Sequence, residues 1–285
     1  MISSVAARYR CPIVSHEVES SCYRRLTLHA PEVARVVRAG QFIHLLPRGE
    51  NSSDPLLRRA FSIMQAKKNE ITILYRIEGR GTSLLSQKAV ADVVDFIGPL
   101  GRCFAPSPHR MILVGGGVGV PPLLMLTRQT REEELAGPKH EITAFVGARS
   151  RDDVLCVRDF AKCGVEMQIA TDDGSVGTHG YVTQLLEAHL LKIKVGMRKP
   201  TQESDTETTD ALVYSCGPLP MLKAVAKICA HYEVPCQVSL EENMPCGVGV
   251  CNGCVVPVAT PSNEYATYSR ICVDGPVMWA HDLKW

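Results

Sequence analysis

The chain has 285 residues, of which 45% are hydrophobic, and its formal net charge is +1. This length suggests about two domains, and the hydrophobic content is high enough to bury a core, which excludes a wholly disordered chain. The balanced charge without a basic stripe argues against a nucleic-acid binder. Because no run of residues is long and apolar enough for a membrane span or a secretory signal, we expect a cytoplasmic protein.

The N-terminal third predicts short strands separated by turns. Apolar and polar residues partly alternate over 41–46, 60–64 and 70–77, as they do in strands that bury one face. Few segments have a helical pattern here, and residues 83–89 are the main candidate. We therefore expect an antiparallel β-barrel or sandwich, followed by a proline-containing linker at 105–109.

From Arg110 the pattern changes to alternating strands and helices. The strand candidates share a run of apolar residues and cover 111–114, 142–146, 165–170, 211–216 and 236–240. Helical patterns between them include 181–191 and 218–231. This alternation predicts a parallel sheet with right-handed crossovers. Residues 201–210 contain four acidic side chains and no basic one, so we expect an exposed loop or insertion there.

Two short motifs in the β-rich part suggest an anion-binding site. Arg59-Ala-Phe61-Ser62 places an arginine on a predicted strand, and Gly79-Arg-Gly81-Thr82 precedes the predicted short helix. Each motif alone is weak, because an arginine beside a strand is usually solvated and Gly-x-Gly-Thr can be a simple turn and helix cap. Their order along the chain makes the pair more informative than either motif.

A glycine-rich turn, Gly115-Gly-Gly-Val-Gly119, lies between a predicted strand and a helical pattern. Such glycines let the backbone approach a pyrophosphate, whose charge is favoured at a helix N-terminus, although a tight strand–helix turn also needs glycine. Two later segments, 171–177 and 214–218, each follow a predicted strand. All three would lie at the carboxyl ends of parallel strands, where open α/β sheets bind ligands. Together they predict a dinucleotide site.

Twelve cysteines are many for a chain of this kind, and eight are scattered. Scattered cysteines are typical of small buried residues, since a disulfide scaffold would be short and secreted. Cys246, Cys251, Cys254 and Cys272 instead follow the spacing Cys-x4-Cys-x2-Cys with a fourth cysteine further on, which is that of a plant-type [2Fe–2S] cluster. The alternative is a four-cysteine zinc site, which usually has two Cys-x2-Cys pairs, and only one pair is present here.

In this order the motifs resemble the signature of the ferredoxin–NAD(P) reductase superfamily, with Cys-Gly-Pro at 216–218 as its last element. The lead-in Ser239-Leu-Glu-Glu-Asn-Met-Pro and the ending Cys272-Val-Asp-Gly-Pro-Val are similar to a narrower family, the electron-transfer subunits of two-subunit, NAD-linked dihydroorotate dehydrogenases. The resemblance covers essentially the whole chain. The departures are the acidic segment at 201–210 and a longer gap before the last clustered cysteine, with 261–267 as the extra loop.

The resemblance implies an α+β multidomain protein. Its parts would be an FAD-binding antiparallel β-barrel at 1–106, an NAD-binding α/β domain with a parallel sheet at 107–240, and a small [2Fe–2S] domain at 241–285. The metal ligands of that last domain would be Cys246, Cys251, Cys254 and Cys272.

In this family the barrel binds FAD, which implies a role for each motif residue. Arg59 would pair with the pyrophosphate, and Gly81 and Thr82 would offer amides to phosphate at a helix start. Phe61 and Ser62 would flank the isoalloxazine, with Ser62 near its N5 atom. The other expected FAD residues are Ala60 and, along the ribityl and adenine side, Leu74, Tyr75 and Arg76.

The family's nicotinamide nucleotide would bind beside the flavin. Its pyrophosphate would meet the glycine-rich loop, and the expected residues are Gly115, Gly116, Gly117, Gly119, Cys216, Gly217 and Pro218. Cys216 would lie near the nicotinamide and is, with Ser62, a candidate catalytic residue, although it could simply be a small buried residue that ends a strand. Arg149 and Arg151 are either ligands for the 2′-phosphate of NADP or surface charges, and the family favours NAD.

The three cofactors imply an order of electron transfer. Nicotinamide exchanges two electrons as a hydride and a [2Fe–2S] cluster passes one at a time, so the flavin, which does both, must lie between them. The family implies that electrons from dihydroorotate reach FMN in a catalytic partner, cross the cluster to FAD and reduce NAD⁺, in a heterotetramer that contacts neither nucleic acid nor membrane. The partner must supply the orotate site, because no motif here does.

Two other functions remain open from the sequence. One is a related FAD and [2Fe–2S] reductase subunit that serves ferredoxin, sulfide or another acceptor. The other is a non-enzymatic zinc-binding interaction module. Glu241 and Glu242, directly before the cysteine motif, are either neighbours of the flavin or ordinary exposed glutamates.

Overall fold

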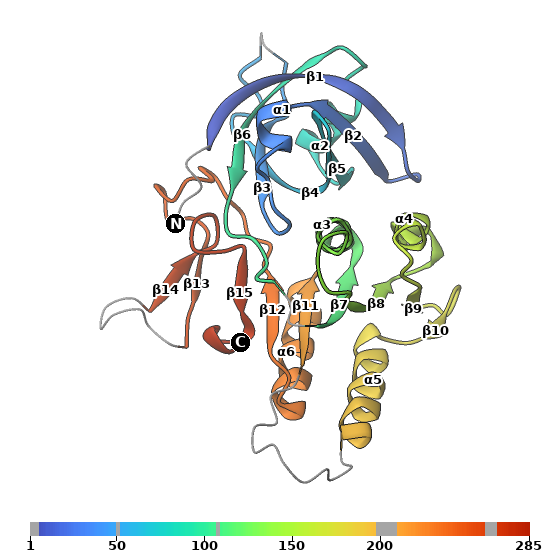
Figure 1. Ribbon diagram of the computed structural model, residues 1–285. Helices are drawn as coiled ribbons and strands as arrows, with labels where there is room; N and C mark the ends of the chain where they lie inside the picture. The colour runs from blue at the N-terminus through green and yellow to red at the C-terminus, as the bar shows by residue number, and fades with distance from the viewer. Residues whose placement is uncertain (1–5, 50–51, 107–108, 198–209, 260–266) are drawn as a thin grey trace.

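The computed structural model describes residues 6–49, 52–106, 109–197, 210–259 and 267–285. An antiparallel barrel lies above a mostly parallel sheet, and the C-terminal segment lies beside both (Figure 1). Parts of three expected loops lie outside the described residues, namely 107–108, 201–209 and 261–266.

The barrel has the strand order β1-β2-β5-β4-β3-β6, and every neighbouring pair is antiparallel. Its strands are β1 (Ala7–Val18), β2 (Tyr23–His29), β3 (Phe42–Leu46), β4 (Arg59–Lys67), β5 (Glu70–Arg76) and β6 (Val93–Leu100). The short helices α1 (Pro31–Ala34) and α2 (Arg80–Ser86) lie between strands. The strands predicted at 41–46, 60–64 and 70–77 are β3, β4 and β5, and the structure is a barrel rather than a sandwich.

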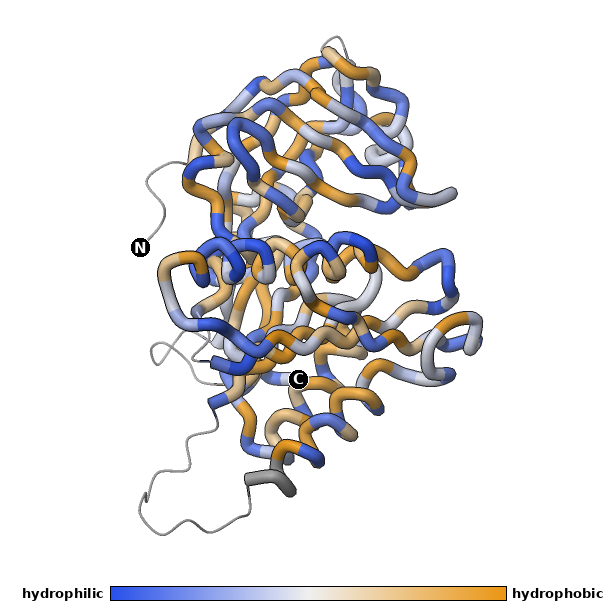
Figure 2. Tube along the Cα trace, turned by 45° about the vertical axis from the view of Figure 1, so that its right-hand side comes forward, coloured by the Kyte–Doolittle hydropathy of each residue, from blue (hydrophilic) through white to orange (hydrophobic). Residues whose placement is uncertain are grey.

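Alternation of side chains explains why these segments form a barrel. Leu26 and Leu28 of β2 pair with Ile73 and Ile71 of β5, and none of the four has exposed surface. The hydroxyls of Thr27 and Thr72, which lie between these pairs, are 3.1 Å apart on the other face. Such period-two alternation buries one face of each strand. Figure 2 shows hydrophobic and hydrophilic residues alternating along the barrel strands.

Helix α2 begins three residues earlier than the helix predicted at 83–89 and ends at Ser86. Its start is set by Thr82, whose hydroxyl accepts hydrogen bonds from the backbone N–H of Glu78 at 2.9 Å and of Gly79 at 3.2 Å. The Gly-x-Gly-Thr motif is therefore part of the helix start, which a hydrophobic pattern alone does not reveal.

The second layer is a sheet with the order β10-β9-β8-β7-β11-β12-β15. Its strands are β7 (Arg110–Gly116), β8 (Glu141–Ala148), β9 (Met167–Thr171), β10 (Thr178–His179), β11 (Ala211–Cys216), β12 (Cys236–Ser239) and β15 (Val277–Trp279). All neighbours are parallel except β12 and β15. The parallel sheet confirms the prediction from alternating strands and helices.

Helices cover both faces of this sheet. On the barrel side lie α3 (Val120–Glu133) and α4 (Val157–Lys162), and on the other side α5 (Val182–Met197) and α6 (Leu219–Tyr232) (Figure 1). Within β7, Met111 and Leu113 join the core shared with the barrel, whereas Ile112 and Val114 join the core under α5 and α6. Three 3₁₀ turns complete the helical elements, η1 (Gly117–Gly119), η2 (Arg151–Asp153) and η3 (Ala280–Asp282). No helix within the described ranges is long and apolar enough to cross a membrane.

The C-terminal segment leaves the sheet and returns to it. After β12 it forms the cysteine-containing loop and a small hairpin of β13 (Val255–Pro257) and β14 (Tyr268–Arg270). Strand β15 then pairs antiparallel with β12, so that Ser239 and Val277 are register partners. At the end of the chain the Trp285 indole donates a hydrogen bond to the Ala280 carbonyl at 2.7 Å.

A buried ion cluster joins the barrel to the α/β layer. Asp159 of α4 accepts a hydrogen bond from Arg25 of β2 and another from Arg128 of α3, both at 2.9 Å. The aspartate is 7% exposed. Burial alone would raise the pKa of Asp159, but hydrogen bonding to Arg25 and the charges of Arg25 and Arg128 hold it below the ordinary range. The carboxylate is therefore ionised and bridges the two layers.

We predict that Asp159→Asn lowers the free energy of unfolding by about 3 kcal/mol at pH 7, because two largely buried arginines lose their common carboxylate. Since the pKa of Asp159 is lower in the folded protein, its contribution is present at neutral pH and is lost as the pH falls through that lowered pKa. Urea unfolding of wild type and variant at pH 7 and near pH 3 measures both effects.

The matched control is Glu133→Gln, which removes another ion pair between the layers, that of Glu133 with Arg38. The side chains of Glu133 and Arg38 are 65% and 61% exposed. This exposed pair should change the free energy by less than about 1 kcal/mol. Equal losses in the free energy of unfolding for the two substitutions would contradict the prediction. So would a loss for Asp159→Asn that is as large near pH 3 as at pH 7.

Candidate functional site

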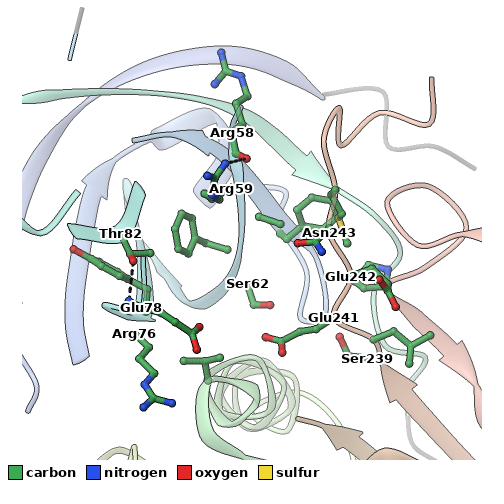
Figure 3. A pocket seen from close by; sticks show the side chains of 18 of the residues that line it. Arg58, Arg59, Ser62, Arg76, Glu78, Thr82, Ser239, Glu241, Glu242 and Asn243 are labelled. Carbon is green, nitrogen blue, oxygen red and sulfur yellow. Dashed lines mark hydrogen bonds between the residues drawn. The ribbon is translucent and has the colours of Figure 1, made fainter. Parts of the chain in front are cut away.

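A pocket of about 700 Å³ opens where the barrel, the sheet and the C-terminal segment meet (Figure 3). Residues of all three parts line it. Those predicted from the sequence are Arg59, Ala60, Phe61, Ser62, Leu74, Tyr75, Arg76, Thr82 and Cys216. Its volume lies within the range that suits a cofactor or a drug-sized ligand. The structure thus brings β4, β5, the start of α2 and the end of β11 together at one cavity.

Two neighbouring arginines at the start of β4 have different surroundings. Arg58 is tied to Asp95 by an ion pair and donates to the backbone carbonyls of Asp95 at 3.0 Å and His44 at 3.3 Å. Within the described chain, Arg59 donates only to backbone carbonyls, those of Leu57 at 3.0 Å and Arg58 at 3.1 Å. Its positive charge is therefore not balanced by any carboxylate that the structure describes and can meet an anion in the pocket.

Gly81 lies beside the Arg59 side chain at the beginning of α2. A Cβ atom at residue 81 would lie 3.4 Å from Arg59 Nε and 3.2 Å from the ring of Pro47. Gly81 does not itself line the pocket. The Gly-x-Gly-Thr motif and the Arg59 side chain are thus neighbours in the folded chain.

Aromatic side chains form one wall of the pocket. The rings of Phe61 and Tyr75 meet edge to face with centroids 5.7 Å apart. The Tyr75 hydroxyl is 2.9 Å from Nε2 of His16, and burial raises the pKa of Tyr75, so the phenol is neutral. Ser62 follows Phe61 on β4 and is the register partner of Phe42, another lining residue. This wall offers a flat apolar surface next to one hydroxyl.

Three glutamates line the pocket at two places, Glu78 beside Thr82 and Arg76, and Glu241 with Glu242 on the segment that leads into the cysteines. Glu78, Glu241 and Glu242 all line it, and in Figure 3 the side chains of Ser62 and Glu241 lie in the same part of the cavity. Burial, together with the charge of Glu78, raises the pKa of Glu241. Both members of the Glu241–Glu242 pair are thus placed near the expected flavin site. No sequence pattern indicated Glu78 as a pocket residue. It lies between β5 and α2 and reaches the pocket only because of where α2 begins.

Half of the remaining lining that sequence reasoning missed comes from the segment that leads into the cysteines, and the other half from the barrel, the glycine-rich turn and the C-terminal segment. These residues share no motif and include Phe42, Leu57, Arg58, Val118, Ser239, Leu240, Asn243, Met244, Pro245 and Pro276. Within the lead-in from Ser239 to Pro245, the sequence marked only Glu241 and Glu242 as possible neighbours of the flavin. The position of this lead-in next to the clustered cysteines is the signal that could have identified it as pocket lining.

The glycine-rich loop packs directly on the end of β11. A Cβ atom at Gly119 would overlap the carbonyl of Cys216, and one at Gly116 would lie 3.2 Å from Pro218. Gly117 has φ +53°, in the left-handed region that favours glycine. The two segments predicted to bind a nucleotide are therefore in contact at the carboxyl ends of β7 and β11. Of their predicted residues only Cys216 lines the pocket, and Gly115, Gly116, Gly117, Gly119, Gly217 and Pro218 lie outside its lining.

The third predicted segment, 171–177, lies at the end of β9 and is tied to the end of β8. The Arg151 guanidinium donates to the carbonyl of Ser175 at 2.8 Å, and the backbone N–H of Arg151 donates to the Ser175 hydroxyl at 2.8 Å. Asp173 accepts hydrogen bonds from the backbone and hydroxyl of the same serine. Arg151 therefore has a structural role in linking two loops at this edge of the sheet.

Cys216 is a neutral thiol. It is 3% exposed. Burial, with a smaller effect of the Glu241 charge, raises the pKa of Cys216 to about 12, although a hydrogen bond with Ser239 acts in the opposite direction. The thiol is protonated at neutral pH, so it can pack against a ligand or donate a weak hydrogen bond but is not a nucleophile there.

Backbone amides converge on the first clustered cysteine. Burial would raise the pKa of Cys246, but hydrogen bonds from the backbone of Cys251, Val248 and Val250 lower it to about 6. Nearby, the backbone N–H of Gly253 points at Cys251 Sγ at 3.4 Å, and that of Cys272 at Cys254 Sγ at 3.5 Å. Amides directed at sulfur favour the thiolate, which is the form that binds metals.

The four clustered thiols form two interacting pairs, Cys246 with Cys251 and Cys254 with Cys272. Among the described residues no three histidine, cysteine or acidic side chains are already arranged as one metal site. Two irons that share four thiolates need two each, so the pairing and the amide donors suit a [2Fe–2S] cluster.

Family models match two parts of the chain. Residues 241–284 match the iron–sulfur cluster binding domain of dihydroorotate dehydrogenase B, and residues 113–227 match an oxidoreductase NAD-binding domain. Among solved structures, an NADH-dependent reduced ferredoxin–NADP oxidoreductase is 26% identical, with a TM-score of 0.75 over 96% of this chain and 90% of that one. A ferredoxin–NADP⁺ reductase from Plasmodium falciparum, 14% identical with a TM-score of 0.61, covers 81% of this chain and 96% of that one and shares the fold.

Curated relatives extend this likeness to nearly the full length. The electron transfer subunit of dihydroorotate dehydrogenase B (NAD(+)) from Geobacillus kaustophilus is 39% identical over 282 residues, which cover 97% of this chain and 98% of that protein. The protein of the same name from Desulforamulus reducens is 38% identical over 260 residues, 90% of each chain. The chain therefore belongs to the family of electron transfer subunits of dihydroorotate dehydrogenase B.

Proposed function

We propose that this chain is an oxidoreductase subunit that passes electrons from a dihydroorotate-oxidising catalytic partner to NAD⁺. The observation that carries the proposal is the shared pocket, which is lined by Ser62 of the barrel, by Cys216 at the end of the nucleotide-binding sheet and by the lead-in to the clustered cysteines. Groups bound at these three parts of the chain would be neighbours. When bound, FAD, NAD and a [2Fe–2S] cluster supply the exchange of one and two electrons.

In the barrel, Arg59 would hold the FAD pyrophosphate together with the amides of Gly81 and Thr82. The absence of a carboxylate partner for Arg59 within the described chain, and the position of its side chain beside Gly81, support this assignment. Phe61 and Tyr75 would pack along the flavin, and Ser62 would offer a hydroxyl near its reacting edge. The remaining contacts would come from Ala60, Leu74 and Arg76.

In the α/β layer, the NAD pyrophosphate would bind the turn from Gly115 to Gly119, helped by Gly217 and Pro218 on the adjoining strand end. The neutral thiol of Cys216 would pack near the nicotinamide, and because it is protonated it would not act as a nucleophile toward the ring. NAD rather than NADP is supported by the relatives, whose name specifies NAD(+).

At the C-terminal segment, Cys246, Cys251, Cys254 and Cys272 would hold the cluster, and the amides near Cys246 would stabilise its negative charge. As partner we propose an FMN-containing catalytic subunit in a heterotetramer. The name of the family supports a separate catalytic subunit, and the exposure of Cys251 and Val250 places the cysteine loop at the surface where a partner could reach it.

The cluster assignment predicts about two irons and two acid-labile sulfides per chain after anaerobic purification. Cys272→Ser should lower both contents while sparing most of the fold, since serine is close to cysteine in size and the core shared by the barrel and the sheet does not include Cys272. Chemical analysis and visible spectra measure this outcome. Cys22→Ser, at an exposed cysteine outside the cluster motif, should leave both contents unchanged. Stoichiometric zinc without iron would refute the assignment.

The FAD assignment predicts that Arg59→Ala weakens binding about tenfold to a hundredfold, because a charge-assisted hydrogen bond contributes about 1.5–3 kcal/mol. Fluorescence titration of FAD into apoprotein gives the dissociation constants. Arg38→Ala serves as the control, since Arg38 is an exposed arginine outside the pocket lining. Unchanged flavin affinity in Arg59→Ala would show that Arg59 does not bind the pyrophosphate.

The division of labour predicts that this chain alone oxidises NADH with artificial acceptors but does not oxidise dihydroorotate. With the catalytic partner present, dihydroorotate should reduce NAD⁺, and Cys251→Ser should abolish only this linked reaction. Steady-state rates of both reactions, at equal FAD content, test the prediction. Loss of both activities together would contradict the serial arrangement, and survival of the linked reaction would leave the cysteine loop with a structural role only.

A further inference from the structure

His44 of β3 is a fully buried histidine at the boundary between the barrel and the cysteine loop. Its neighbours Ile43 and Leu45 belong to the barrel core, whereas Phe42, two residues away on the face of β3 that His44 shares, lines the pocket. The ring has no exposed surface. Neither ring nitrogen makes a hydrogen bond of good geometry among the described residues, although backbone groups of Met244 and Cys246 lie near the ring. Buried polar groups are almost always paired, so this ring calls for an explanation.

The cysteine loop covers the ring. A Cβ atom at Gly247 would lie 2.5 Å from Nδ1 of His44, and Gly247 has φ +71°, which favours glycine. Burial lowers the pKa of His44, as do the charges of Arg58 and Arg59, while backbone groups of Met244 and Cys246 act to raise it. The loop backbone thus surrounds a neutral imidazole, which has one N–H donor and one acceptor.

The backbone of the same residue is attached to the wall of the pocket. The His44 carbonyl accepts a hydrogen bond from Arg58 at 3.3 Å, and Arg58 is ion-paired with Asp95 of β6. In the β3–β4 ladder His44 pairs with Ala60, which lies between Arg59 and Phe61 in the pocket lining. His44 therefore contacts both the strand that would hold the flavin and the loop that carries Cys246.

We propose that His44 is a positioning residue that fastens the cysteine loop to the flavin-binding barrel. Its ring N–H donates to the loop backbone at Met244 or Cys246, which fixes the position of the loop relative to the pocket. Gly247 is required because any side chain there would displace the ring. The inference rests on the proposed function, since it concerns electron exchange between a flavin and a cluster.

The test compares His44→Leu, which fills similar space without polar atoms, with His44→Asn, whose amide nitrogen replaces Nδ1. His29→Leu, at an exposed histidine on β2, is the matched control. Stopped-flow mixing with NADH follows flavin reduction and then cluster reduction in each protein. The EPR spectrum and midpoint potential of the cluster are measured on the same samples, together with iron and FAD contents.

We expect His44→Leu to slow cluster reduction at least about tenfold and to broaden or shift the EPR signal, with flavin reduction by NADH and FAD content unchanged. His44→Asn should recover most of the rate and the wild-type spectrum, and His29→Leu should behave as wild type. Gly247→Ala changes the same contact by placing a Cβ atom against the His44 ring, and it should therefore reproduce the behaviour of His44→Leu.

Equal rates and spectra in wild type and His44→Leu would overturn the inference. So would equal impairment by Leu and Asn, which would show that the ring only fills space. These outcomes differ from failure of the proposed function, in which the wild-type protein itself would lack FAD or iron or would show no cluster reduction after NADH.

Discussion

The burial of α3 between the barrel and the sheet is the interaction on which the remaining structure depends. Leu123, Leu124 and Met125 of this helix belong to one apolar core that also contains Ile63 and Met64 of the barrel. The two layers are therefore not independent bodies joined by a linker, because separating them would expose this shared core to water. The Asp159 ion cluster adds charge pairs at the same boundary. The pocket is formed by groups from both layers, so its shape follows from this contact.

Absent side chains are as important as present ones at the site. Gly119 lets the turn after β7 touch the carbonyl of Cys216, and Gly81 leaves room for the Arg59 guanidinium. In both places the missing side chain lets two parts of the chain pack closely. The cysteine loop uses backbone in another way, since its N–H groups lie close to the sulfur of Cys246. Main-chain dipoles of this kind favour the thiolate form of that cysteine.

The sequence predicted the features that depend on local pattern. The alternation in β5, the strand–turn–helix around Gly115 and the spacing of the cysteines each arise within a few residues, so both layers of the fold and most of the barrel lining could be predicted. Features that depend on distant contacts could not. Nothing adjacent in sequence shows that Arg58 is held by Asp95 while Arg59 remains in the pocket, or that Glu78 and Met244 meet there. The neighbours of His44 likewise come from a loop some two hundred residues away.

The return of the C-terminal segment to the sheet has a consequence for how this part of the protein tolerates change. Everything between Ser239 and Val277 is an excursion whose two ends are held side by side as register partners of β12 and β15. Lengthening such an excursion adds little closure entropy, since its cost grows only slowly with loop length. The hairpin between β13 and β14 is thus a place where residues can be added without disturbing the nucleotide-binding sheet. The excursion thus combines two fixed strand ends with a surface hairpin, so that changes in its length need not be felt at the strands that anchor it.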